Sequence, residues 1–302
     1  MRFKLLYSIV WLISLLPLSI LYLLSDVIYL LIFYVVKYRR QVVRDNLVSA
    51  FPEKNVEEIK KIEKKFYSFF SDYIVETIKF CTISEKEIRR RIKFEGVEEM
   101  VNNLGLTHKN FAFIYLAHYC NWEWVASLAL SIHDANPKAV AGQIYHPLKD
   151  ADFDRLFLKI RGRFHGDNIS MKETLRYILR KRNQGVPTII GFIADQAPKW
   201  NSIHHWTDFL NHKTPVFTGT EQIAKQVDAL VYYCHVERPK RGYYRCAITK
   251  VTDDAKSWQD YDLTDAYFAH LASTIQSEPS YWLWSHKRWK RTYEEFLERQ
   301  KQ

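Results

Sequence analysis

The chain has 302 residues, of which 47% are hydrophobic, and a formal net charge of +10. This length suits one large α/β domain or two small ones, and the sequence contains no internal repeat. A basic surface can serve nucleic acid, anionic lipid or an acidic protein partner, so charge alone does not choose among them. The four cysteines form no CxxC pair and no metal-ligand spacing, which predicts reduced, mostly buried thiols.

The N-terminal segment is strongly apolar. Residues 5–25 carry no charge, and a second apolar stretch, 27–36, follows Asp26. Since a membrane-spanning helix needs about 20 apolar residues, we expect residues 1–40 to be a membrane anchor. It would be one tilted span plus an interfacial helix, or two partly embedded helices, with kinks at Pro17 and Asp26. The run is too long for a signal peptide, and the heavier basic cluster after it favours a cytoplasmic location for the rest of the chain.

Residues 41–302 are expected to form one domain of helices and strands. Apolar periodicity predicts eight helices, at 56–80, 85–92, 122–132, 152–160, 170–185, 220–227, 264–276 and 292–299. Capping boxes mark the first, at Asn55, and the fifth, at Ser170. Apolar or alternating runs predict four strands, at 111–116, 186–194, 229–234 and 243–251, the last two paired across the turn at 238–242. This alternation predicts an α/β fold with a mixed, mostly parallel sheet flanked by helices.

The first candidate site follows the first predicted strand, where His118 and Glu123 form an HX4E pattern. Active sites of open α/β sheets gather at the carboxyl ends of strands. His118 must lie in the loop before the helix if Glu123 is to reach it, because five residues on one helix turn the side chains about 140° apart. A carboxylate on one imidazole nitrogen leaves the other free to take a proton from a hydroxyl. The pattern also fits an ordinary loop histidine with a solvated glutamate, or Cys120 as a nucleophile.

Three further segments carry candidate substrate-binding residues. Arg161 and Arg163 flank Gly162, and an arginine fork binds phosphate or carboxylate, although two arginines also suit a solvated helix end. Asp195 follows the second predicted strand, where it can serve a site or cap a turn. Gly219 begins a predicted helix whose backbone N–H groups can meet an anion.

The C-terminal segment 281–291 interleaves aromatic residues with cations. Such a segment can stack nucleic-acid bases or lie at a membrane interface with its cations on lipid head groups. The apolar N-terminus favours the membrane. The only histidine cluster, at 204, 205 and 212, has no metal-ligand spacing and is interpreted as surface residues.

Taken in order, these segments resemble the bacterial lipid A biosynthesis acyltransferases, the late lauroyl/myristoyl transferases of the lysophospholipid acyltransferase superfamily. The resemblance covers nearly the whole chain. It begins with the basic run and Asn-Leu-Val-Ser-Ala-Phe-Pro at 39–52 and continues through the HX4E pair to the segment 279–290. It implies a glycerol-phosphate-acyltransferase-like fold with an N-terminal membrane helix.

The resemblance also implies a reaction. A fatty acyl chain would pass from an acyl carrier protein thioester to a hydroxyl of a lipid A precursor, without a metal or organic cofactor. His118 would be the general base and Glu123 would orient it. Arg163 would hold a phosphate or brace Glu123, and Asp195 would orient Arg163 or a loop amide.

The implied partners are acyl carrier protein, a lipid acceptor and the cell inner membrane, with the catalytic domain on the cytoplasmic side and no nucleic acid. A basic surface would steer the acidic carrier, with Arg89–Arg91 and Lys181–Arg182 as candidate contacts. The sequence Gln-Ala-Pro after Asp195 departs from the family pattern, so another acceptor, such as an amino-acid-containing lipid, stays open. Two further classes of protein stay open as well, a non-catalytic lipid-binding protein and a nucleic-acid-binding module.

Overall fold

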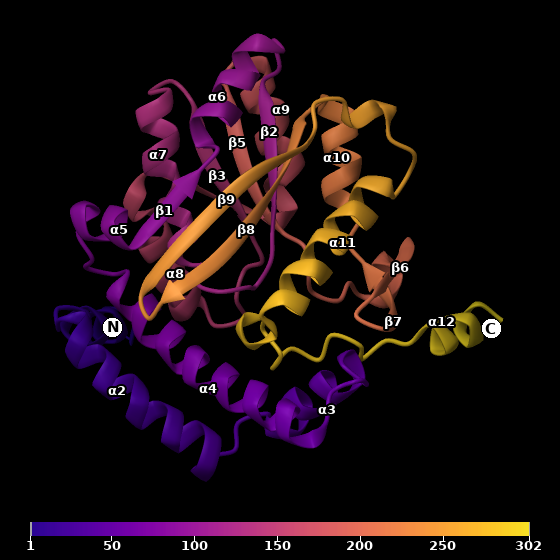
Figure 1. The fold of residues 1–302 in the computed structure, drawn as a ribbon. Coiled ribbons are helices and arrows are strands. Elements are labelled where there is room, and N and C mark those ends of the chain that lie inside the picture. The colour runs from indigo at the N-terminus through magenta and orange to yellow at the C-terminus, as the bar shows by residue number, and fades with distance from the viewer. Residues whose placement is uncertain (1, 302) are drawn as a thin grey trace.

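Seven strands form the central sheet, in the order β1-β9-β8-β2-β5-β3-β4 (Figure 1). The computed structural model describes residues 2–301. The strands are β1 Ile92–Glu95, β2 Phe111–Leu116, β3 Val140–Tyr145, β4 Asp167–Ser170, β5 Thr188–Ile193, β8 Leu230–Lys240 and β9 Tyr243–Thr252. Neighbouring strands are parallel except β8 and β9, which are antiparallel. The predicted mixed, mostly parallel sheet flanked by helices is therefore confirmed.

The helices lie around this sheet and along its lower end in Figure 1. They are α1 Arg2–Ser14, α2 Leu18–Leu30, α3 Arg40–Ala50, α4 Val56–Lys79, α5 Glu85–Arg91, α6 Val97–Leu106, α7 Leu128–Ala135, α8 Ala151–Arg161, α9 Thr174–Asn183, α10 Gly219–Val227, α11 Asp262–Ser277 and α12 Tyr293–Gln300. Every residue of β2 is buried, which is why this central strand reads as an unbroken apolar run. All four cysteines are free and buried, as predicted.

Helix α4 and the β8–β9 hairpin follow the sequence prediction closely. The Asn55 side chain accepts the backbone N–H groups of Glu57 and Glu58, and the Glu58 side chain bonds the Asn55 N–H, so the predicted capping box is present. The hairpin turns at Gly242, whose φ of +73° is in the left-handed region that glycine tolerates.

Several local predictions are wrong at helix starts. The helix expected at 122–132 begins as α7 only at Leu128, after a short 3₁₀ turn at Trp124–Ser127. Ser170 makes no capping hydrogen bond, because it ends strand β4 and a 3₁₀ turn separates it from α9.

Some short elements have no counterpart in the prediction. They are the helices α3 and α6, the strands β1, β3 and β4, and a separate hairpin of β6 (His205–Phe209) and β7 (His212–Val216). The three sheet strands are short or only partly buried, so they lack the apolar run that marks β2.

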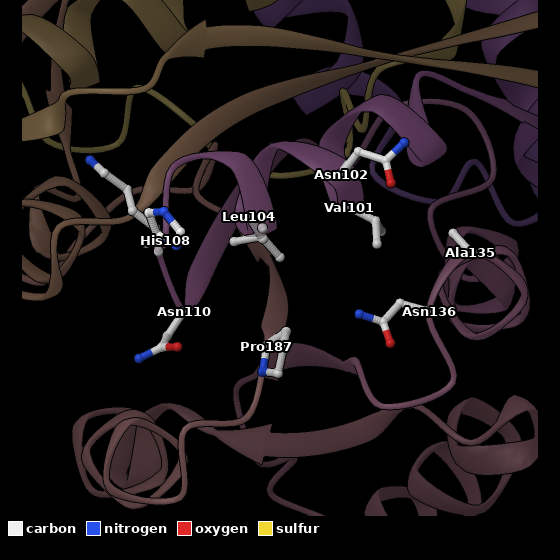
Figure 2. Close-up of a pocket in the computed structure, with 10 residues that line it drawn as sticks. Val101, Asn102, Leu104, His108, Asn110, Ala135, Asn136 and Pro187 are labelled. Carbon is white, nitrogen blue, oxygen red and sulfur yellow. The ribbon is translucent and has the colours of Figure 1, made fainter.

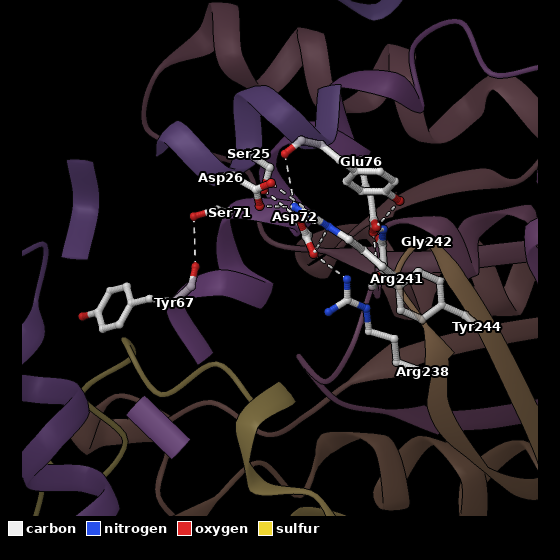
Figure 3. Close-up of polar contacts among 12 residues, drawn as sticks. Ser25, Asp26, Tyr67, Ser71, Asp72, Glu76, Arg238, Arg241, Gly242 and Tyr244 are labelled. Atoms are coloured by element: carbon white, nitrogen blue, oxygen red, sulfur yellow. Dashed lines mark hydrogen bonds and ion pairs between the residues drawn. The ribbon is translucent and has the colours of Figure 1, made fainter. Parts of the chain in front are cut away.

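The N-terminal helices pack against α4 along a polar edge (Figures 1 and 3). Pro17 separates α1 from α2 as expected, but Asp26 lies within α2 and does not break it. Instead Asp26 pairs with Arg241 at 2.6 Å, and the Ser25 hydroxyl donates to Asp72 at 2.7 Å. Asp26 therefore fastens α2 to the β8–β9 hairpin, and Ser25 fastens it to α4.

The opposite face of these helices is apolar and exposed. It carries Leu5, Ile9, Leu12, Ile20, Leu23, Val27, Leu30 and Leu31. A π-helical turn, Leu31–Val35, continues α2, and the resulting helix Leu18–Val35 is long and apolar enough to cross a membrane. The N-terminus thus has one face bound to the domain and one face without a protein partner among the described residues.

Candidate active site

The sheet brings His118 and Asp195 together. They follow β2 and β5, which are parallel neighbours, and Leu116 pairs with Ile193, so positions 118 and 195 leave the sheet side by side. His118 Nδ1 lies 2.7 Å from Asp195 Oδ1, and the His118 backbone N–H donates to Asp195 Oδ2 at 3.1 Å. Both residues lie at the carboxyl edge of the sheet, where active sites of this architecture gather.

Asp195 is held as an ionised carboxylate. It is 2% exposed, and the Trp282 indole N–H donates to its Oδ2 at 2.8 Å. Burial acts to raise the pKa of Asp195, but attraction to His118 and the hydrogen bonds from His118 and Trp282 outweigh burial and hold that pKa below its usual value. An ionised carboxylate at Nδ1 favours the tautomer with the proton on Nδ1. His118 Nε2 then carries a lone pair that can accept a proton, and the Gln196 amide nitrogen, a donor 3.3 Å away, faces it where the acceptor hydroxyl must enter.

Glu123 binds Arg161 and not His118, which corrects the expected pairing. Arg161 Nε donates to Glu123 Oε2 at 2.7 Å and Arg161 Nη2 donates to Oε1, a two-point contact. Burial acts to lower the pKa of Arg161, but Glu123 raises it above its usual value. Arg161 thus uses two of its donors on Glu123, and its expected role in substrate binding stays a prediction.

The Glu123–Arg161 pair also supports one wall of the site. The Tyr73 hydroxyl lies 3.4 Å from Glu123 Oε1, and the Tyr73 ring stacks on Trp122 at a centroid distance of 4.1 Å. Trp122 in turn meets the His118 ring edge to face at 5.1 Å. The aromatic side chains beside the imidazole thus rest on the ion pair.

Arg163 and Gly219 make no hydrogen bond with His118 among the described residues. The Arg163 guanidinium donates to the backbone carbonyls of Phe80 and Ile83, and burial lowers its pKa. Arg163 therefore stabilises the chain turn between Phe80 and Ile83. The arginine that pairs with Glu123 is Arg161. Gly219 is the first residue of α10, and no contact among residues 2–301 joins it to His118; its expected role in substrate binding stays a prediction.

The loop after His118 is fixed by a buried carboxylate. Asn121 Nδ2 donates to Glu76 Oε2 at 2.7 Å, while Asn121 Oδ1 accepts the Trp124 N–H at 3.0 Å. Glu76 also accepts hydrogen bonds from Tyr22 of α2 and Tyr244 of β9 (Figure 3). Burial raises the pKa of this carboxyl. One side chain thus connects the N-terminal helix with the loop that carries His118.

Cys120 is no longer a candidate nucleophile. It is fully buried, and burial raises the pKa of its thiol well above the usual value, which disfavours the reactive thiolate.

The C-terminal segment contributes to the site in a way that sequence reasoning missed. Trp282 binds Asp195, and the Leu283 N–H donates to the His118 carbonyl at 3.1 Å. A β-bridge joins Tyr119 to Trp282. In the sequence, this segment is marked only by its alternation of aromatic residues and cations. That pattern does not reveal that Trp282 binds Asp195, which lies 87 positions earlier in the chain.

The burial of His286 leads us to expect that the stability of the fold depends on pH. Burial lowers its pKa to about 4, and repulsion from Lys290 and Arg288 acts in the same direction. Between pH 6.5, the usual pKa of histidine, and pH 4, His286 binds a proton in the unfolded chain but not in the folded chain. The free energy of unfolding therefore falls as the pH is lowered through this range. Melting temperatures between pH 7 and 4 should therefore fall less steeply for His286→Gln than for the native chain; identical slopes would show that His286 is not the group responsible.

The structure also has a cavity that does not include the candidate active site. It has a volume of about 460 Å³ and is lined by residues that include Lys109, Asn110 and Pro187 (Figure 2). These residues precede β2 and β5, so the cavity lies at the amino ends of the strands whose carboxyl ends carry His118 and Asp195.

The comparisons with known proteins agree with this architecture. A search of curated proteins returns no significant match to the chain. Residues 3–291 match the family described as bacterial lipid A biosynthesis acyltransferase. This match spans nearly the full sequence, from α1 to the cation-rich C-terminal segment, and includes the whole sheet and the His118–Asp195 pair. The chain therefore belongs to the bacterial lipid A biosynthesis acyltransferase family.

Proposed function

We propose that this acyltransferase moves a fatty acyl chain from acyl carrier protein to a hydroxyl of a lipid A precursor, with His118 as the general base. The observation that carries the proposal is the contact of 2.7 Å between His118 Nδ1 and the buried carboxylate of Asp195, in a chain of this family. Such a pair is suited to removing a proton from a hydroxyl at neutral pH.

In the proposed reaction, His118 Nε2 takes the proton of the acceptor hydroxyl as its oxygen attacks the thioester carbonyl. The carbon–sulfur bond then breaks, an ester forms on the acceptor, and the proton on His118 passes to the leaving thiolate. The charge of Asp195 stabilises the imidazolium while it lasts. No acyl-enzyme is required, and Glu123 acts as a positioning residue through Arg161 and the Tyr73–Trp122 wall.

We also propose that the protein works at the cytoplasmic face of the inner membrane. Support comes from the exposed apolar face of α1 and α2 and from the apolar helix Leu18–Val35. At a rise of 1.5 Å per residue, this helix is about 27 Å long. Since its polar edge is bonded to α4 and the β8–β9 hairpin, the domain would stay against the lipid surface, where a lipid acceptor is found.

Acyl carrier protein is the proposed donor, and most of the candidate contacts for it already face carboxylates of this chain, Lys181 lying 3.7 Å from Asp167. Arg89, Arg90 and Arg91 are each paired with carboxylates of their own chain. This pairing reduces the positive charge that they offer to an acidic partner.

The test of the acceptor class uses membranes that contain the protein, acyl-acyl carrier protein and one of two acceptors. With a tetra-acylated lipid A precursor, mass spectrometry should show a gain of one acyl chain. The comparison acceptor is an amino-acid-containing lipid with a free hydroxyl. Acylation of that lipid alone would replace the acceptor and keep the chemistry, whereas acylation of neither lipid would contradict the proposed function.

A further inference from the structure

Five cations gather where the C-terminal segment meets the start of α3. We call Arg39, Lys287, Arg288, Lys290 and Arg291 the cation cluster. Within residues 2–301, none of them has a carboxylate oxygen within 4.0 Å, although many other cations of the chain do. Asp195 attracts Arg288, but from beyond ion-pair distance, so the repulsion among these like charges favours a further anion at the cluster.

Contacts and electrostatics join the cluster into one group. Arg39 Nη1 donates to the carbonyl of Ser285 at 2.9 Å, which ties α3 to the segment that carries the other four cations. Burial lowers the pKa of Lys290, and repulsion from each of the other four members lowers it further. A bound anion would remove this repulsion.

Arg288 and Arg291 have donors that no protein group uses. Arg288 is fully buried, and its Nη2 donates to the Pro215 carbonyl at 2.8 Å, but its Nε and Nη1 have no partner among the described residues. The Nε and Nη1 atoms of Arg291 are unpartnered too. A buried guanidinium without a counter-ion is costly, because desolvation is not offset by an ion pair.

Contacts of the C-terminal segment bring the cluster near His118 in space. Leu283, four residues before Lys287, donates its N–H to the His118 carbonyl. His286 lies next to the cluster in sequence, and its Nε2 lies 3.5 Å from the Ala197 N–H, in the loop that follows Asp195. A group held by the cluster would therefore lie next to the proposed base.

We propose that the cation cluster binds a phosphate group of a substrate beside His118. Arginine forks and lysines are the usual protein partners of phosphate. Arg163, the residue expected to do this from the sequence, already donates to two backbone carbonyls. This inference rests on the proposed function. The phosphate has two possible sources, a phosphomonoester on the lipid acceptor or the phosphodiester of the arm that carries the donor thioester.

The kinetic test compares the full-length protein with Lys287→Gln/Lys290→Gln. A matched control is Lys93→Gln/Lys172→Gln, which removes the same charge from exposed lysines elsewhere. For a phosphorylated acceptor, we expect KM to rise roughly tenfold or more in the cluster variant, since a hydrogen bond to a charged group is typically worth that factor. The value of kcat should stay within about twofold, and the control should match the native protein.

The two sources give different results. If the acceptor supplies the phosphate, an enzymatically dephosphorylated acceptor shows the same KM with native and variant protein. If the donor supplies it, KM rises for acyl-acyl carrier protein instead. Unchanged KM values for both substrates would overturn the inference while leaving the proposed function intact.

A binding test remains valid even if no transfer is observed. The probes are a deacylated glucosamine disaccharide bisphosphate and phosphopantetheine, titrated calorimetrically into the detergent-solubilised chain. We expect one of them to bind with an affinity that falls as salt is raised, and to bind at least about tenfold more weakly to the cluster variant than to the control. Equal binding to both variants, or binding of neither probe to the native chain, would overturn the inference.

Discussion

Replacing Asp195 with asparagine is expected to lower kcat by about 10³–10⁴ while leaving the fold intact. Oδ2 of Asp195 accepts two fixed donors, the His118 backbone N–H and the Trp282 indole N–H. The asparagine oxygen must take this place, so its NH₂ group faces His118 Nδ1. Nδ1 then becomes the acceptor and the proton moves to Nε2. An Nε2 that already carries a proton cannot take one from the acceptor hydroxyl.

The control for this prediction is the structural integrity of the variant. Asparagine is isosteric with aspartate and keeps the contact to Trp282, so circular dichroism and the melting temperature should stay close to those of the native chain. If kcat falls by less than about tenfold in a folded Asp195→Asn variant, Asp195 does not set the tautomer of a catalytic histidine.

Replacing Glu123 with glutamine is expected to lower the free energy of unfolding by about 3 kcal/mol. Glu123 is 2% exposed and is the only carboxylate within 4.0 Å of Arg161 among residues 2–301, so the variant leaves a mostly buried guanidinium without a counter-ion. The loss of stability should be at the lower end of the range for broken buried ion pairs, because the Arg161 side chain is 21% exposed and water can partly solvate its charge. Urea unfolding measures the change.

A double-mutant cycle separates this role from direct support of His118. Removing both charges, with Glu123→Gln and Arg161→Met, should recover part of the lost stability, because no charge is then left unpaired. Activity should fall in Glu123→Gln as the Tyr73–Trp122 wall loosens. If the double variant is no more stable than Glu123→Gln, the ion pair is not what holds Glu123.

The main architecture could be predicted because its elements carry local signals. β2 is an unbroken buried run, α4 has a capping box and an apolar stripe, and the β8–β9 turn has a glycine where φ is positive. These signals depend on neighbours a few residues apart. Strands β3 and β4 lack them, since they are short or partly exposed and are defined by their pairing in the sheet.

The residues of the candidate site stand out in the sequence by type and position, but their contacts could not be predicted. His118 and Asp195 both follow buried strands, which is visible in the sequence. Their contact depends on β2 and β5 being adjacent, although residues 117–187 lie between these strands in the chain, and on the pairing of Leu116 with Ile193. Glu123 lies only five residues from His118, yet the intervening loop directs it to Arg161. Of the two partners expected for Asp195, it bonds a loop amide, the His118 N–H, and not Arg163.

The central claim is that His118 is the base for acyl transfer to a lipid hydroxyl, and a single-turnover assay tests it most directly. Native protein and His118→Ala, matched for folded content, are mixed with acyl-acyl carrier protein and a tetra-acylated lipid A precursor, and the products are followed by mass spectrometry. We expect one added acyl chain with the native protein and a rate lower by about 10²–10⁴ with the variant. A variant that transfers the chain at nearly the native rate would contradict the account.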